Sequence, residues 1–390
     1  MTRDAWRPIR TGNRRSHCRL ALKRCWTGCA SKRKQTDMSL VSVVIPSYNH
    51  SRYIRGAVES VLEQTHEDVE LIVIDDGSKD DSLVYLRSVT DPRMQLVEQA
   101  NAGAHNAINR GLAMAKGDFL AVLNSDDIFH RRRLEVALEA LGQPGIDLVA
   151  SWIEVIDTDG KALGVKEGWH NMLPWPIANP KRTFAASDSF AKNLLMTNFV
   201  STTSNVVFSR RLYDEVGGMR NLRFAHDWDF LLRAARQFGC ELIAQPLMQY
   251  RIHSSNTISS NRAWMLFEIC WVLAVGMMHF EGNLLYASDD RDALIADARA
   301  LAESINVQGN DRIVWMIRQF VDARRKLRDP EAETRLLDDK ELRDVFLDYI
   351  DAGDAPAVLA GAAPALPVAV PSGVRGLAYR VARRLAQGAA

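Results

Sequence analysis

The stretch VSVVIPSY, residues 41–48, determines the fold expected for this chain. A continuous apolar run of this length, closed by polar turn residues, is typical of a strand buried on both faces of a parallel sheet. Residues 51–64 follow helical spacing, and ELIVIDDGS, residues 70–78, indicates a second buried strand that ends in a turn. Strand, helix and strand in this order predict a βαβ unit.

The same alternation continues along the chain. MQLVEQ, residues 94–99, predicts a third strand, residues 103–117 a helix that closes on Gly117, and DFLAVLNSDD, residues 118–127, a fourth strand. The fold class is therefore α/β, with a mostly parallel central sheet flanked by helices. Ligands of such open sheets bind at the carboxyl ends of the strands.

Length and composition narrow the possible functions. The chain has 390 residues of which 47% are hydrophobic, enough for a large core, and its net charge of +1 gives no sign of a nucleic-acid partner. No G-x-G-x-x-G follows the first strand and no P-loop is present, so a bound phosphate would need a metal. The longest apolar run, residues 264–280, contains Glu268 and is shorter than the roughly 20 residues that span a bilayer, which predicts a core helix.

Polar side chains follow the first, second and fourth strands and should converge at one edge of the sheet. The first strand ends in Pro46, Tyr48 and Asn49, the second in Asp75 and Asp76, and the fourth in Asn124, Asp126 and Asp127. The adjacent carboxylates of Asp126 and Asp127 can hold a divalent cation that bridges the oxygens of a diphosphate. They can equally cap a following helix, and Tyr48 can be a base-stacking platform or a core residue, so these alternatives stay open.

Four segments taken together resemble the inverting GT-A-type glycosyltransferases of glycosyltransferase family 2. They are VVIPSYNH (43–50), VIDDGSKDDS (73–82), the segment 101–127 that ends in LNSDD, and FAHDWDFLLRAA (224–235). The resemblance covers about residues 40 to 260 and implies a GT-A-like catalytic domain.

The resemblance also implies roles for individual residues. Asp227 would be the catalytic base, and Asp126 and Asp127 would bind Mn²⁺ or Mg²⁺. A nucleotide-sugar would contact Pro46, Tyr48, Asn49, Asp75, Asp76, Asn101, Gly103, Asn109, Asn124, Asp126 and His253. Arg251 and Arg262, on either side of His253 in the sequence, are possible phosphate contacts.

Inverting transfer needs a general base that takes the proton of the acceptor hydroxyl. The family usually has Glu-Asp before an aromatic residue, so Asp227 matches the base and His226 replaces the Glu. Asp229 is an alternative base, although two positions along a helix it points to a different face. Asn124 and Ile108 also depart from the family pattern, where Asp and Arg are frequent.

The implied reaction moves a sugar from a nucleotide-diphosphate sugar, with UDP the expected carrier, to a hydroxyl of a glycan or lipid-linked acceptor. Cell-surface polysaccharide or glycolipid synthesis would be the setting. The alternative is a catalytically silent nucleotide- or carbohydrate-binding protein on the same fold. An expected cytoplasmic location rests on the five cysteines, which form no paired Cys-x-x-Cys framework.

The expected organisation has five parts. Residues 1–37, with eleven Lys or Arg and two Asp, are a basic disordered or mis-started segment. The catalytic domain spans 38–262, divided into a nucleotide-sugar half (38–130) and an acceptor half (131–262). A helical extension (263–350), an Ala- and Pro-rich linker (351–373) and a basic amphipathic tail (374–390) follow, and the tail could contact a membrane surface peripherally.

Overall fold

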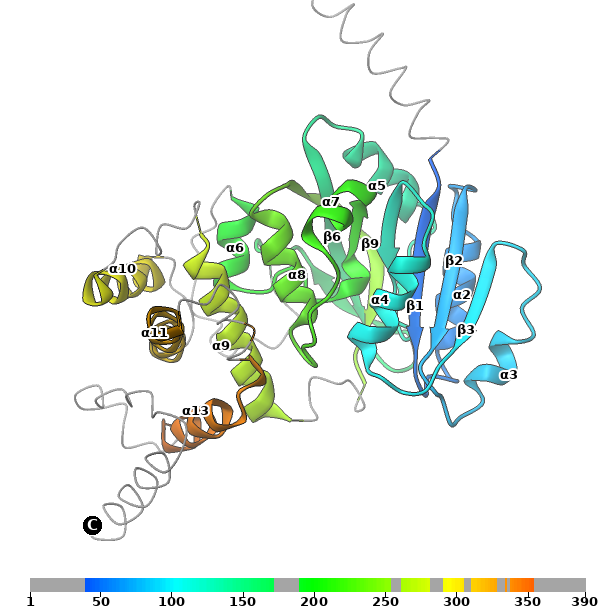
Figure 1. Cartoon of the computed structure of the whole chain (residues 1–390). Coiled ribbons are helices and arrows are strands. Elements are labelled where there is room, and N and C mark those ends of the chain that lie inside the picture. The colour runs from blue at the N-terminus through cyan, green and yellow to red at the C-terminus, as the bar shows by residue number, and fades with distance from the viewer. Residues whose placement is uncertain are drawn as a thin grey trace, which may run out of the picture.

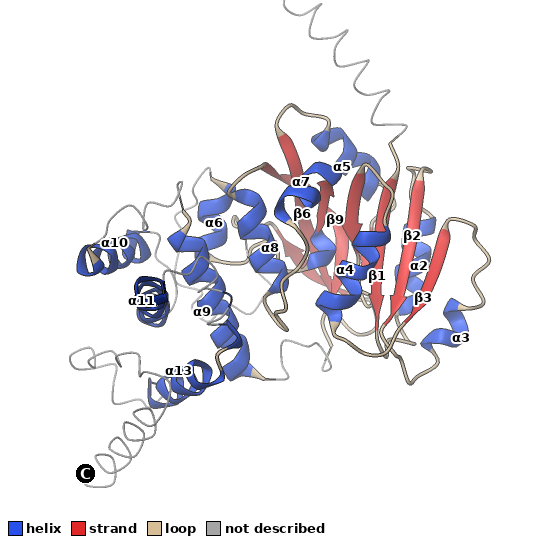
Figure 2. Ribbon diagram, in the orientation of Figure 1, coloured by secondary structure: helices blue, strands red, loops and turns tan. Residues whose placement is uncertain are grey.

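The computed structural model describes residues 39–171, 189–253, 261–280, 290–304, 310–327, 334 and 337–353. These residues form one nine-stranded sheet with helices on both faces, and a group of helices packs beyond one end of the sheet (Figures 1 and 2). The expected basic N-terminal segment, the C-terminal tail and all but the first three residues of the linker lie outside the described residues.

The first half of the sheet is parallel, as the βαβ pattern predicted. Its strands lie in the order β3-β2-β1-β4, and β1 pairs with both β2 and β4. The carboxyl ends of β1, β2 and β4 therefore lie side by side. The strands are β1 (Val41–Ser47), β2 (Val69–Asp75), β3 (Met94–Glu98) and β4 (Phe119–Val122), and the helices are α2 (Ile54–Leu62), α3 (Ser82–Leu86) and α4 (Ala104–Met114).

The second half of the sheet is mixed. Strand β8 is antiparallel to β4 and to β6, whereas β6 and β9 run parallel. The elements are β5 (Ile128–Phe129), α5 (Arg133–Leu141), β6 (Ile146–Ile156), β7 (Ala162–Lys166), α6 (Phe190–Met196), a 3-10 turn η1 (Thr203–Asn205), β8 (Val206–Ser209), α7 (Arg210–Val216), α8 (His226–Ala235) and β9 (Gly239–Arg251). The α/β fold with helices on both faces of a central sheet is confirmed.

Two hydrophobic clusters cover the two faces of the sheet. One packs α2 and α5 against β1, β2 and β6, and the other joins α4, α6 and α8 to the C-terminal helices. Those helices are α9 (Arg262–Met278), α10 (Arg291–Ser304), α11 (Asn310–Leu327) and α13 (Lys340–Gly353). The C-terminal helices thus share a core with the sheet.

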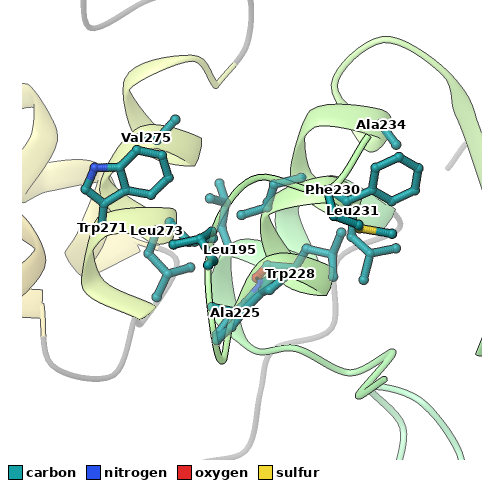
Figure 3. Packing of buried hydrophobic residues seen from close by; sticks show 14 of the residues in the cluster. Leu195, Ala225, Trp228, Phe230, Leu231, Ala234, Trp271, Leu273 and Val275 are labelled. Carbon is teal, nitrogen blue, oxygen red and sulfur yellow. Dashed lines mark hydrogen bonds between the residues drawn. The ribbon is translucent and has the colours of Figure 1, made fainter. Parts of the chain in front are cut away.

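Helix α9 confirms the core helix predicted for the longest apolar run. Figure 3 shows its Trp271, Leu273 and Val275 in the same cluster as Leu195 of α6 and Trp228 of α8. Among the described residues, no helix is both long enough and apolar enough to cross a bilayer.

Two local expectations were wrong. Helix α4 ends at Met114, before Gly117, because Gly117 lies against the backbone at the start of β1. The helix-cap interpretation of Asp126 and Asp127 also fails, because the next residues form the short strand β5, and α5 begins only at Arg133.

We predict that Gly117→Ala destabilises the protein. An added Cβ would lie 2.6 Å from the amide nitrogen of Ser42 and 2.7 Å from the carbonyl oxygen of Leu40, atoms that cannot move without breaking the sheet. Overpacking of this kind should lower the free energy of unfolding by at least about 2 kcal/mol, measured by urea denaturation. Gly56→Ala in α2 is the matched control, since its Cβ meets nothing closer than 3.7 Å. An equal loss in both variants would contradict the prediction.

Candidate active site

The loops after β1 and β2 are joined by hydrogen bonds at the carboxyl edge of the sheet. Asn49, in the left-handed region at φ 53°, accepts a hydrogen bond from the Lys79 amide (2.7 Å) and donates its own amide to the Ser78 hydroxyl (3.0 Å). Tyr48 beside it is 45% exposed, which excludes the core interpretation and leaves its ring accessible to a ligand. Pro46 lies within β1, paired with Ile74.

The two carboxylates that end β2 shape the neighbouring loops. Asp76 accepts hydrogen bonds from the amides of Ala102 (2.8 Å) and Gly103 (2.9 Å) and from the Gln99 side chain (2.7 Å). Gly103 has φ 90°, which favours glycine, and it precedes the first residue of α4. Asp75 accepts from the Ser78 amide (2.9 Å) and hydroxyl (2.6 Å). Both carboxylates are buried and hold the turn that borders the site.

Three potential metal ligands from distant parts of the chain meet beyond β4. One ligand atom each from His50, Asp126 and His253 lies within 4.8 Å of the others. The Nε2 atom of His253 is 2.9 Å from Asp126 Oδ2, and the Nδ1 atom of His50 is 2.7 Å from the Ser125 hydroxyl. Two imidazoles and one carboxylate are a donor set that a divalent transition ion accepts.

The aromatic and charged neighbours keep this cluster ordered. The Tyr53 ring stacks on His253 at 5.2 Å between ring centroids. Burial lowers the pKa of His50, and this outweighs the nearby Asp126 carboxylate, which acts to raise it. A neutral imidazole is the form that binds a metal, so the site favours the protonation state that a ligand requires.

Asp127 lies outside this cluster, in contrast to the expected pairing of Asp126 with Asp127 at one metal. Its carboxylate is 1% exposed and accepts hydrogen bonds from the Ser204 hydroxyl (2.6 Å) and the Arg251 amide (3.1 Å). Burial, followed by the charge of Asp126, raises its pKa well above the usual range. Asp127 therefore ties the end of β4 to η1 and β9.

Asn124 and Arg251 are engaged with the protein in a similar way. The Asn124 side chain donates to the Thr202 hydroxyl (3.0 Å) and accepts from the Thr203 hydroxyl (3.1 Å). The Arg251 guanidinium donates to the carbonyl oxygens of Asp126 (3.0 Å) and Asp157 (3.0 Å). Arg251 thus supports the loop of Asp126.

Asp227 is the second residue of α8 and has a defined hydrogen-bond environment. One carboxylate oxygen accepts from the Trp228 amide (2.7 Å) and the other from the Asn198 side chain (3.2 Å). Burial raises the pKa of Asp227, and the charge of His226 acts in the opposite direction. A raised pKa brings a carboxylate closer to the range in which it can accept a proton from a hydroxyl.

Asp229 does not have the environment of a base. Its carboxylate is 2% exposed and is paired with Arg220 (3.0 Å) and Arg233 (2.9 Å). Arg233 also donates to the carbonyl oxygens of Val216 and Gly218, so Asp229 belongs to the support of α8. The geometry favours Asp227 over Asp229.

A buried lysine lies near Asp227. Lys166, at the end of β7, is fully buried and contacts the Ser201 hydroxyl and the Asn198 carbonyl oxygen. Burial lowers its pKa to about 7, although the charge of Asp227 acts to raise it. Burial, followed by the charges of Asp127, Asp126 and Asp227, raises the pKa of Tyr250 on β9.

The remaining expected residues are divided between the site and its supports. Asn101 is exposed in the loop that Asp76 holds. Asn109 on α4 donates to the Met219 carbonyl (2.8 Å) and accepts from the Met219 amide (2.8 Å), so both ends of its side chain hold the loop before α8.

Sequence reasoning assigned no role to His50, Lys166 or Asn198. The position of His50, just after the carboxyl end of β1, is a signal that could have identified it, because polar residues there face the ligand edge. Lys166 and Asn198 have no such signal, since each reaches the site through long-range packing.

Comparisons with known proteins agree with this architecture. The profile described as glycosyl transferase family 2 matches residues 42–217. An uncharacterised glycosyltransferase of Nostoc sp. is 34% identical over 224 residues, which are 55% of this chain and 66% of that protein. The glycosyltransferase GlyG of Streptococcus pneumoniae is 34% identical over 125 residues, 31% of this chain and 42% of that protein. This chain spans less than two thirds of the length of either relative.

Among solved structures, Staphylococcus aureus TarS 1–349 in complex with UDP superposes with a TM-score of 0.48 and 18% identity, covering 81% of this chain and 88% of TarS 1–349. Residues 42–217 of this chain thus match the family model of glycosyl transferase family 2, and the similarity to the Nostoc protein extends over 224 residues.

Proposed function

We propose that the protein is a metal-dependent inverting glycosyltransferase that moves a sugar from a nucleotide-diphosphate sugar to a hydroxyl acceptor. The observation that carries the proposal is the pair of features that the fold assembles: a buried carboxylate, Asp227, held by Asn198 and the Trp228 amide, and a separate cluster of His50, Asp126 and His253. A base and a diphosphate-holding site are the two requirements of a single-displacement transfer.

Asp227 acts on the acceptor in this proposal. It accepts the proton as the acceptor oxygen forms its bond to the anomeric carbon, while the bond from that carbon to the diphosphate oxygen breaks. Asn198 and the Trp228 amide fix the orientation of the carboxylate through their hydrogen bonds. Because the proton passes to Asp227 and the electron pair leaves with the diphosphate, no covalent enzyme intermediate is needed.

The donor occupies the edge where β1, β2 and β4 end. Tyr48 offers an exposed aromatic face for the base, and the turn held by Asp75 and Asp76 borders it. His50, Asp126 and His253 would hold a divalent ion, which when bound stabilises the negative charge of the departing diphosphate. Their two imidazoles suit Mn²⁺ better than Mg²⁺, which prefers oxygen ligands. UDP remains the first nucleotide to test.

Calorimetric titration of UDP, GDP and dTDP with and without Mn²⁺ tests the donor site, and release of nucleotide diphosphate from the matching sugar donors tests transfer. We expect one nucleotide to bind, and to bind more tightly with Mn²⁺. If none of the three nucleotides binds, the proposed donor site is wrong. If one binds but no sugar is transferred to a panel of glycan and lipid-linked acceptors, a catalytically silent binding protein is favoured.

Replacing Asp227 tests the base. We predict that Asp227→Asn lowers kcat by about 100-fold or more, because the amide cannot accept the proton, while the dissociation constant of the nucleotide is unchanged. Asp229→Asn is the comparison, and it should lower thermal stability through the loss of charge opposite Arg220 and Arg233. A greater loss of kcat in folded Asp229→Asn than in Asp227→Asn would reverse the assignment.

The metal-ligand cluster leads to a prediction that does not depend on activity. His50→Ala and Asp126→Ala should each weaken Mn²⁺ binding, measured by calorimetry with the nucleotide present, by at least about tenfold. Asp127→Asn should leave the Mn²⁺ affinity much closer to that of the wild type, since Asp127 faces Ser204 and the Arg251 amide. His170→Ala, an exposed histidine outside the cluster, is the control. Stronger dependence on Asp127 than on His50 would refute this ligand set.

The pH dependence of kcat/KM tests the environment of Asp227. Burial raises its pKa, so the base should lose activity on the acid side at a pH above about 3.9, the usual value of an aspartate. The charge of His226 acts to lower that pKa, and His226→Ala should therefore move the acid limb to higher pH. The profile is measured at saturating Mn²⁺, and a downward shift in the variant would be inconsistent with this electrostatic account.

A further inference from the structure

Helix α9 carries one charged side chain inside its apolar length, and that side chain has a specific set of partners. Glu268 is 2% exposed, although it lies in the helix between residues that belong to the hydrophobic core. A buried carboxylate is costly unless it is hydrogen-bonded, so the contacts of Glu268 explain why an acid persists there.

The partners of Glu268 are the backbone of the loop that leads into α8. Its carboxylate accepts hydrogen bonds from the amides of Arg223 (2.9 Å), Phe224 (2.7 Å) and Ala225 (3.1 Å), and from the indole nitrogen of Trp264 (2.9 Å). Three consecutive amides converge on one side chain. Because two of these donors face each carboxylate oxygen, a neutral amide in place of the acid could satisfy only half of them.

The clamped loop sets the position of Asp227. Ala225 is the N-cap residue of α8 and makes no side-chain cap, while its carbonyl oxygen accepts the Asp229 amide (3.0 Å). Asp227 follows two residues later, so a shift of Ala225 moves the base directly. Near-attack geometry tolerates little displacement, and a misplacement of about 1 Å can cost about 100-fold in rate.

We propose, resting on the function proposed above, that Glu268 is a positioning residue that holds Asp227 in register with the acceptor through the backbone of residues 223–225. The C-terminal helices thereby become part of the catalytic apparatus. Arg343 of α13 lies over the Trp264 ring at 4.3 Å, and Trp264 in turn donates to Glu268, which extends the connection to the last described helix.

The test compares Glu268→Gln with Glu139→Gln, the same exchange at an exposed position of α5. Glu268→Gln keeps the shape of the side chain but presents an amino group to the backbone amides, and we expect kcat to fall by about 100-fold while the dissociation constant of the donor nucleotide with Mn²⁺ is unchanged. Glu139→Gln makes the same exchange on the opposite face of the sheet from α8, so its kcat should stay near that of the wild type. A purely structural role would instead lower donor binding and kcat together, and that result would overturn the proposal.

Hydrogen exchange provides a readout independent of turnover. The amides of residues 223–225 should exchange at least about tenfold faster in Glu268→Gln, whereas amides of β1 and β2 should not change. If the wild type is active and Glu268→Gln keeps the full kcat, the positioning role is refuted and the proposed transferase activity stands. A wild type without any transfer would instead refute the proposed function, and exchange would then decide alone whether Glu268 holds the loop. If Glu268→Gln fails to fold, Glu268→Asp, whose shorter side chain withdraws the acceptors, takes its place with the same expected outcomes.

Discussion

The site depends on one kind of interaction: a buried carboxylate accepts hydrogen bonds from backbone amides and hydroxyl groups of other elements. The clearest case is Asp127, which is buried at the end of β4 and is bound by the Ser204 hydroxyl and the Arg251 amide. A carboxyl group without partners in such a place would be strongly destabilising, so its hydrogen bonds hold the ends of β4 and β9 and the turn η1 together. The neighbouring Asp126 is thereby directed toward His50 and His253.

The same device recurs at two other loops. Asp76 gathers the amides of Ala102 and Gly103 ahead of α4, and Glu268 gathers those of residues 223–225 ahead of α8. In each case an acid from one element fixes the backbone that begins another element. The site is consequently assembled from irregular segments whose positions are set by buried, hydrogen-bonded charge, and the surrounding helices supply the low-polarity packing that gives those hydrogen bonds their strength.

Sequence reasoning succeeded where the signal was local. The strands β1 to β4 and the helices α2, α4 and α9 were predicted from apolar runs and periodicity, whereas the short helix α3 was not. The gathering of Tyr48, Asp76 and Asp126 at one edge followed from the rule for parallel strands. It failed where a long-range contact decided the outcome. Gly117 was predicted to end a helix, but it is the point where the chain passes close to the backbone at the start of β1. The two segments are 75 residues apart in the chain, so no local pattern indicated the contact.

The sequence by itself determined the α/β architecture and the chemical types of the residues at the strand ends. Both can be read from the alternation of apolar runs with polar turns over a few neighbouring residues. Only the tertiary structure decided which carboxylate faces a ligand and which one supports the fold. Asp126 and Asp127 are adjacent and chemically identical, yet one joins the two histidines and the other is surrounded by Ser204 and Arg251. These different roles of Asp126 and Asp127 depend on contacts between residues 50, 126, 204 and 251–253. Those residues are far apart in the chain, so no local sequence pattern indicates that they meet.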